Sequence, residues 1–156
     1  MFALLIACTI NQALAKNKND NAEAFLRFKP LIETIRLDNL EKFVAEFEKQ
    51  NPDINEPLNE FGTTALNFAI VHNSSKVFEY VLVQFPNLEI NCQDIVGSTA
   101  LHLSAVSCNY NFFTDLVKYK ADTTLKNTGG YTAIDLVEEL CKKNDQLLTF
   151  ARAQKN

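Results

Sequence analysis

One short motif occurs three times in this chain at nearly constant spacing. The chain reads GTTALNFAI from Gly62, GSTALHLSA from Gly97 and GYTAIDLVE from Gly130, so successive copies begin 35 and then 33 residues apart. A fixed frame of Gly, Thr, Ala and an aliphatic residue at such a period is typical of a repeat protein, in which each unit packs on its neighbours. The motif therefore predicts a repeat array.

The composition agrees with a folded domain. The 156 residues give room for one domain, and a hydrophobic share of 47% with a charged share of 22% is that of an ordinary globular protein. The net charge of -4 and the lack of a basic run argue against nucleic acid or an anionic membrane as the partner. Only four Gly and four Pro punctuate the chain, which favours short helices over many-stranded sheets.

The first residues have the pattern of a targeting segment. Phe2 to Ile10 (FALLIACTI) is an apolar run, and Ala13-Leu14-Ala15 is an A-x-A cleavage site, so residues 1–15 are predicted to be a signal peptide that ends before Lys16. The run is too short for a transmembrane span, which takes about 20 apolar residues. No Lys or Arg precedes Phe2, so two alternatives stay open: a start codon upstream, or an ordinary buried helix.

A second interpretation of this segment is a lipoprotein signal. Leu5-Ile6-Ala7-Cys8 resembles the bacterial lipobox, and a lipid anchor at Cys8 would hold the protein at a membrane surface. Only seven residues precede Cys8, so the lipid anchor ranks below the simple signal peptide.

The cysteines are expected to be free thiols. Without the leader the chain keeps Cys92, Cys108 and Cys141, and the last two lie 33 residues apart at the same place in successive repeats. Stacked repeats place such positions roughly 10 Å apart, a helix-packing distance, which is beyond an unstrained disulfide. We therefore expect partly buried thiols that pack as small apolar residues. No C-x-x-C or Cys/His cluster indicates zinc.

Each repeat has the pattern of two short helices and a turn. In the third repeat Thr99 is expected to cap a first helix, and Cys108-Asn109 to end it, because Asn tolerates the left-handed conformation. In the second repeat Asn73 is expected to do the same. The second helices carry apolar stripes at helical spacing, formed by Val77, Phe78, Val81 and Leu82 and by Phe112, Phe113, Leu116 and Val117.

These features resemble the ankyrin repeat family, whose repeats open with D-x-x-G-x-T-P-L-H-x-A-A and close with G-A-D-V-N. The third repeat matches the opening at Asp94, Gly97, Thr99, Leu101, His102 and Ala105, with Ala100 in place of the Pro. Parts of the close are matched by Asp53-Ile54-Asn55, Glu89-Ile90-Asn91 and Ala121-Asp122. The resemblance covers about residues 30 to 150. It implies an all-α ankyrin repeat solenoid of about four stacked helix-turn-helix repeats with projecting β-turn fingers.

The resemblance also divides the chain. Residues 16–29 are expected to be an N-terminal extension and residues 30–156 the ankyrin repeat domain. Its repeats are expected at about 30–58, 59–93, 94–126 and 127–156. The first lacks the Gly-Thr-Ala opening and the last has polar ends, as capping repeats do.

Neither histidine is expected to be catalytic or to bind a metal. The resemblance implies that His102 makes hydrogen bonds within and between repeats, and Asn67 and Asp135 hold the equivalent positions. His72 has no second ligand at metal-binding spacing and is expected on the surface. No nucleophile motif, phosphate loop or H-E-x-x-H helix occurs. The chain is therefore predicted to be no enzyme and to need no cofactor, metal or small-molecule substrate.

The turn tips and the exposed side of the first helices are the expected binding surface, because ankyrin domains typically bind there. The two middle residues of each turn project, and three of them are large and apolar, namely Phe61, Ile95 and Val96. A contiguous apolar patch of this kind marks an interface, unless adjacent fingers pack together and hide it. The predicted partner-binding residues are Glu60, Phe61, Thr63, Val71, His72, Ile95, Val96, Ser98, Val106, Ser107 and Tyr131.

The predicted function is that of a non-enzymatic module that binds a partner protein through its fingertips and concave helix face. Its specific role is that of an exported inhibitor, an immunity protein or an effector. The alternative is a structural or accessory protein that stabilises or assembles a neighbouring enzyme in the cell envelope. The protein is expected to be exported, to the periplasm or the exterior, if the leader is functional, and cytoplasmic otherwise.

Overall fold

The structure, a computed structural model, describes the backbone of residues 18–155 and the side chains of residues 26–155. The predicted signal peptide and the candidate lipid anchor at Cys8 lie outside the described residues. Eight helices follow one another in the described part of the chain. They are α2 (Lys18–Arg36), α3 (Leu40–Gln50), α4 (Ala65–Val71), α5 (Ser75–Gln84), α6 (Ala100–Val106), α7 (Tyr110–Lys118), α8 (Ala133–Leu140) and α9 (Asp145–Ala153).

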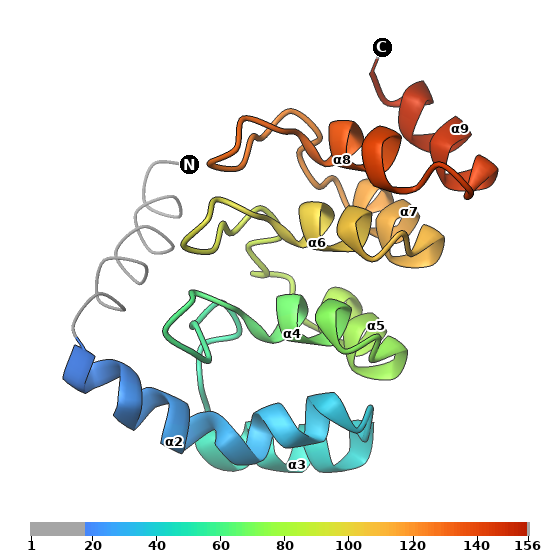
Figure 1. The fold of residues 1–156 in the computed structure, drawn as a ribbon. Helices are drawn as coiled ribbons and strands as arrows, with labels where there is room; N and C mark the ends of the chain where they lie inside the picture. Colours follow the sequence, from blue (N-terminus) through green and yellow to red (C-terminus); the bar gives the residue numbers. More distant parts are fainter. Residues whose placement is uncertain (1–17, 156) are drawn as a thin grey trace.

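The helices form antiparallel pairs that stack along one axis (Figure 1). The first helices of the pairs, α2, α4, α6 and α8, pack on one another in an inner layer, and α3, α5, α7 and α9 form the outer layer. Between the pairs, long turns project to one side as fingers, at the left of Figure 1. Residues 18–155 contain no strand, and their one isolated β-bridge joins Lys126 and Thr132 in the last finger. The all-α solenoid of four helix pairs confirms the expected fold class.

The first pair departs from the pattern of the others. Helix α2 runs through the expected boundary between extension and repeat domain at residue 30, with Pro30 inside the helix. Asp38 and Asn73, each in the left-handed conformation after an inner helix, lie 35 residues apart, as do Pro30 and Ala65. Pro30 therefore holds the position at which the second repeat begins its inner helix. The chain before Ala65 forms a finger, whereas the chain before Pro30 is helical (Figure 1).

The inner helices α4, α6 and α8 begin at threonines, as expected for Thr99. Thr64, Thr99 and Thr132 are the N-caps of α4, α6 and α8, and each side chain accepts the N–H of the residue three positions on. Such a cap is worth about 1 kcal/mol. Helices α4 and α6 end at left-handed residues, with φ of 56° at Asn73 and 50° at Cys108, whereas Cys141 after α8 has a φ of -97°. Asn109, which was expected to help end α6, is instead the N-cap of α7, where its side chain accepts the N–H of Phe112.

The core lies between the two layers and runs through the whole stack. The expected stripe on α5 is buried at all four positions, and Phe112, Phe113 and Leu116 are buried on α7 while Val117 is half-buried. The rings of Phe78 and Phe112 lie 4.4 Å apart and join the outer helices of adjacent repeats. The core therefore has no break between repeats, and each repeat completes the packing of its neighbour.

The expectation of free thiols is wrong. Cys108 and Cys141 form a disulfide with Cα atoms 5.5 Å apart, and no cysteine among the described residues, Cys92 included, is free. The spacing of about 10 Å applies to helix axes, whereas these two cysteines lie just past the ends of α6 and α8. There the chain turns toward the next helix, so the two backbones approach within disulfide reach.

Candidate functional site

Each finger is built around one Asn or Asp side chain. Oδ1 of Asn59, Asp94 and Asn127 accepts two backbone N–H bonds, from the second and the fourth residue that follow, at 2.8 to 3.1 Å. The turn closes through an N–H bond from a glycine, for example from Gly97 to the carbonyl of Asp94 at 2.9 Å. These bonds satisfy the turn backbone locally, so the two tip residues can point outward.

Neighbouring fingers are hydrogen-bonded to each other through their tips. The N–H of Ile95 donates to the carbonyl of Phe61 (3.1 Å), and the N–H of Thr128 donates to the carbonyl of Val96 (3.0 Å). A Cβ on Gly97 would lie 3.1 Å from the backbone N of Thr128, which shows how closely the fingers approach. The three fingers therefore form one continuous surface.

The contact between fingers leaves the apolar side chains at their tips exposed to solvent. Phe61 is 53% exposed, Ile95 and Val96 are each 50% exposed, and Tyr131 is 45% exposed. Adjacent fingers pair through their backbones and do not hide these side chains from solvent. The structure thus brings the predicted apolar fingertip residues together on one edge of the molecule.

The inner helices carry a matching apolar row. Val71 of α4 and Val106 of α6 hold the same register position and are 58% and 57% exposed. Helices α4 (ALNFAIV) and α6 (ALHLSAV) contain no charged residue. The fingertips and this helix row together form a surface with an uncharged centre, which we call the concave surface.

The remaining predicted site residues surround this apolar centre. Glu60, His72 and Ser107 are exposed, whereas Thr63 and Ser98 are half-buried at the base of their fingers. The ring of His72 stacks on Phe68 of the same helix, with centroids 6.0 Å apart and planes within 7°. His72 is therefore a surface residue that contacts an aromatic ring, as its isolation in the sequence predicts.

Other apolar residues of the same surface were missed in the sequence. Leu37 and Leu140 are 62% and 51% exposed, and each directly precedes the residue that ends an inner helix. His72 and Ser107 hold the same position in the two central repeats. Half-buried Phe68, Leu103 and Leu136 form a further row on α4, α6 and α8. The repeat register could have identified both rows, because equivalent positions in stacked repeats lie on one face.

His102 has the structural role that the resemblance implies. Its Nδ1 lies 3.2 Å from the N–H and 2.8 Å from the hydroxyl of Thr99, and its Nε2 lies 3.0 Å from the carbonyl of Tyr131 in the next repeat. A backbone N–H only donates, so Nδ1 accepts and the ring proton is on Nε2. Burial lowers the pKa of His102 below its usual value, against the opposing effect of the bond to Tyr131. The neutral ring therefore links two repeats.

The residues at the equivalent positions do not make this link between repeats. Asp135 accepts the N–H and the hydroxyl of Thr132, and these bonds lower the pKa of the Asp135 carboxyl. Asn67 is buried, and its Nδ2 has no hydrogen-bond partner among the described residues. The Asn side chain is shorter than that of His102, so the position keeps its polar character without the bond to the next finger.

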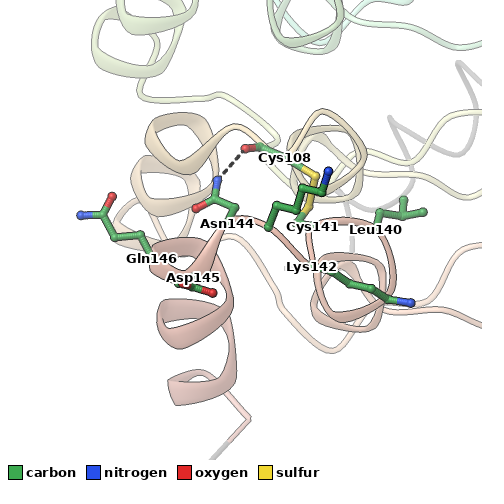
Figure 2. A pocket seen from close by; sticks show the side chains of 8 residues that line it. Cys108, Leu140, Cys141, Lys142, Asn144, Asp145 and Gln146 are labelled. Carbon is green, nitrogen blue, oxygen red and sulfur yellow. Dashed lines mark hydrogen bonds between the residues drawn. A yellow bond between two sulfur atoms is a disulfide. The ribbon is translucent and has the colours of Figure 1, made fainter.

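Among the described residues there is neither a metal-binding cluster nor a helix that could cross a membrane. Within residues 26–155 no three His, Cys, Asp or Glu side chains gather at metal-binding distance. Helix α2 has the length but not the apolar composition of a membrane span, and the other described helices are too short. An open pocket of about 600 Å³ lies beside the Cys108–Cys141 disulfide (Figure 2).

Comparison with known proteins agrees with this architecture. The family model described as ankyrin repeats, in three copies, matches residues 2–127, which is well over half of the chain. The match ends before α8 and α9, which the structure places as a further helix pair on the same stack. No curated protein matches the sequence. Ankyrin repeats are generally modules for protein–protein interaction. On the motif, the helix pairs and the family match, the chain belongs to the ankyrin repeat family.

Proposed function

We propose that this protein binds a partner protein on its concave surface and acts without catalysis of its own. One observation carries the proposal: large apolar residues from two fingers and two inner helices are about half-exposed on one face. Phe61, Ile95 and Val96 supply the finger side, and Val71 and Val106 the helix side. Contiguous exposed apolar surface of this kind usually marks an interaction site.

The uncharged centre limits what the partner can present. A charge buried against α4 and α6 would find no opposite charge on either helix, and an unpaired buried charge is costly. The partner is therefore expected to contribute an apolar segment, with its polar groups reaching the rim at residues such as Glu60 and Ser107. Four stacked repeats offer about 800 Å² per side, as a standard interface does.

Within this binding role we propose an exported inhibitor, immunity protein or effector. Two features support export. The apolar segment Phe2–Ile10 is followed by an A-x-A site, and disulfides such as Cys108–Cys141 form and persist in oxidising compartments. The second candidate is an accessory protein that stabilises a neighbouring enzyme. An assay of the partner separates the two roles, since inhibition lowers the activity of the partner on binding and stabilisation preserves it.

A capture experiment tests the proposed surface. The full chain is used as bait against envelope, secreted and cytosolic fractions, beside a variant that carries Phe61→Asp, Ile95→Asp and Val96→Asp. Three charges in the apolar centre should abolish capture of the partner, because each would be buried unpaired in the complex. The fraction that yields the partner also identifies the compartment.

A matched variant controls for general effects of the substitutions. Val83 on the outer helix α5 is 55% exposed, as exposed as Phe61, but lies on the other layer of the stack. Val83→Asp should leave capture unchanged. If the finger variant captures as much partner as the wild type, or if Val83→Asp abolishes capture, the concave surface is not the binding site.

A further inference from the structure

The left-handed residue after each of the inner helices α2, α4 and α6 also ties its repeat to the next one. Oδ1 of Asp38 accepts the N–H of Lys76 and of Val77 at the start of α5, at 2.9 and 3.1 Å. Oδ1 of Asn73 accepts Nδ2–H of Asn109 at 3.0 Å. Cys108 occupies the same position in the third repeat, and there the tie is the disulfide to Cys141. One backbone position thus carries three inter-repeat ties, of which the last is covalent.

The covalent tie joins the helix pair α8–α9 to the rest of the stack. In the structure α8 and α9 pack on one neighbouring repeat, α6–α7, whereas the central pairs pack on two. Two extra residues, Lys142 and Lys143, lie between Cys141 and the N-cap Asn144, whereas Cys108 directly precedes its N-cap. Beside the disulfide, Nδ2–H of Asn144 donates to the carbonyl of Cys108 at 3.1 Å (Figure 2). Farther along the junction, the bonds of His102 and of the fingers described above also join the two repeats.

The disulfide borders a pocket. Both cysteines line the pocket of about 600 Å³, together with Leu140 and the two lysines (Figure 2). Cys141 is 2% exposed, whereas Cys108 is only half-buried. Lys142 and Lys143 are exposed, and neither makes an ion pair with another described residue. Positive charges close to a disulfide favour attack by a thiolate and stabilise the thiolate that departs.

We propose that Cys108–Cys141 is a thiol–disulfide exchange site for a dithiol reductant, and that its reduction releases the α8–α9 pair from the stack. A thiolate of the reductant attacks Sγ of Cys108, the less buried of the two cysteines, and expels Cys141 as a thiolate. The second thiol of the reductant then attacks the mixed disulfide, so the reductant leaves as a disulfide. The protein gains two electrons and two protons and holds two thiols.

The consequence is local. In a repeat stack each unit is stabilised by its own packing and by its neighbours, so a weakened terminal junction opens the terminal unit first. Reduction should therefore loosen the finger at Tyr131 with α8 and α9, while α4 keeps its packing on α2, α5 and α6. This inference does not depend on the proposed function.

The test uses the folded full chain and dithiothreitol as the dithiol. After reduction in native buffer and alkylation, peptide mapping should find Cys108 and Cys141 modified together without denaturant. Hydrogen exchange should then rise at least about tenfold in residues 133–153 and stay unchanged in α4. Modification of this pair only after denaturation, or unchanged exchange in residues 133–153 once the pair is reduced, would overturn the proposal.

Two variants assign the effect to this bond and its surroundings. The double variant Cys108→Ser, Cys141→Ser should show fast exchange in α8–α9 without reductant and no further change with it, which separates this bond from any other cysteine. Lys142→Gln with Lys143→Gln should slow reduction about threefold at low salt, with the difference lost at high salt. Equal reduction rates at low salt would contradict the role of the lysines.

Discussion

At the scale of single residues, His102 makes stability depend on pH. Protonation would place a second proton on Nδ1, opposite the N–H of Thr99, so the folded state disfavours the charged ring. Because burial lowers the folded pKa below the ordinary value of 6.5, the unfolded chain takes up the proton first as the pH falls. The contribution of His102 to stability is therefore fully present above pH 6.5 and is lost as the pH falls from 6.5 through the lower pKa of the folded state.

The variant His102→Asn, which copies the residue at position 67, tests this dependence. It should lose about 0.5 to 1.5 kcal/mol at neutral pH, because the bond to the carbonyl of Tyr131 is gone. Its free energy of unfolding should also fall less than that of the wild type between pH 7 and 5. Denaturant melts at several pH values measure both effects, and parallel pH profiles for the two proteins would contradict the account.

At the scale of structural elements, the stability of the fingers depends on how closely neighbouring fingers approach each other. Gly97 and Gly130 both have positive φ, 72° and 80°, in equivalent turns. A Cβ on Gly97 would meet the backbone of Asn127 and Thr128 at 3.1 to 3.3 Å, whereas a Cβ on Gly130 would meet no atom within 4 Å. The two glycines therefore share the conformational requirement, but not the close contact.

This pair gives a matched prediction. Gly130→Ala should destabilise by about 1 to 2 kcal/mol through backbone strain alone. Gly97→Ala should cost about 1 to 3 kcal/mol more, because the neighbouring finger must shift and its bond from Thr128 to Val96 lengthens. Urea denaturation compares the two variants. Equal losses would show that the fingers do not pack against each other as described.

The elements also show what could be predicted from the sequence. The threonine caps, the buried stripes and the projecting tips follow from local chemistry that recurs in each repeat, and the structure has them where they were expected. The disulfide does not follow in this way. Whether Cys108 and Cys141 meet depends on where two helix ends lie relative to each other, and helix spacing alone pointed to the wrong distance. The helical stretch before Pro30 could not be predicted from the repeats, because it replaces a finger and carries no repeat motif.

At the scale of the whole molecule, the residues that form the core differ from those that form the proposed binding surface. The core runs between the layers through all four helix pairs, while the fingers and inner helices present the concave surface to solvent. Apolar residues on this surface, such as Phe61 and Val106, contribute little to the core and remain half-exposed. In the proposed function these are the side chains that a partner covers.

Side-chain footprinting of the complex tests the central claim most directly. Hydroxyl radicals modify exposed aromatic and aliphatic side chains, so the partner captured by the full chain should protect Phe61, Tyr131 and Val106 from oxidation. Tyr119, which is 46% exposed at the end of the outer helix α7, is the internal reference and should be oxidised equally with and without the partner. Protection of the three concave-surface residues alone is the predicted result. Protection of Tyr119, with Phe61 and Tyr131 unchanged, would place the partner on the outer layer and contradict the account.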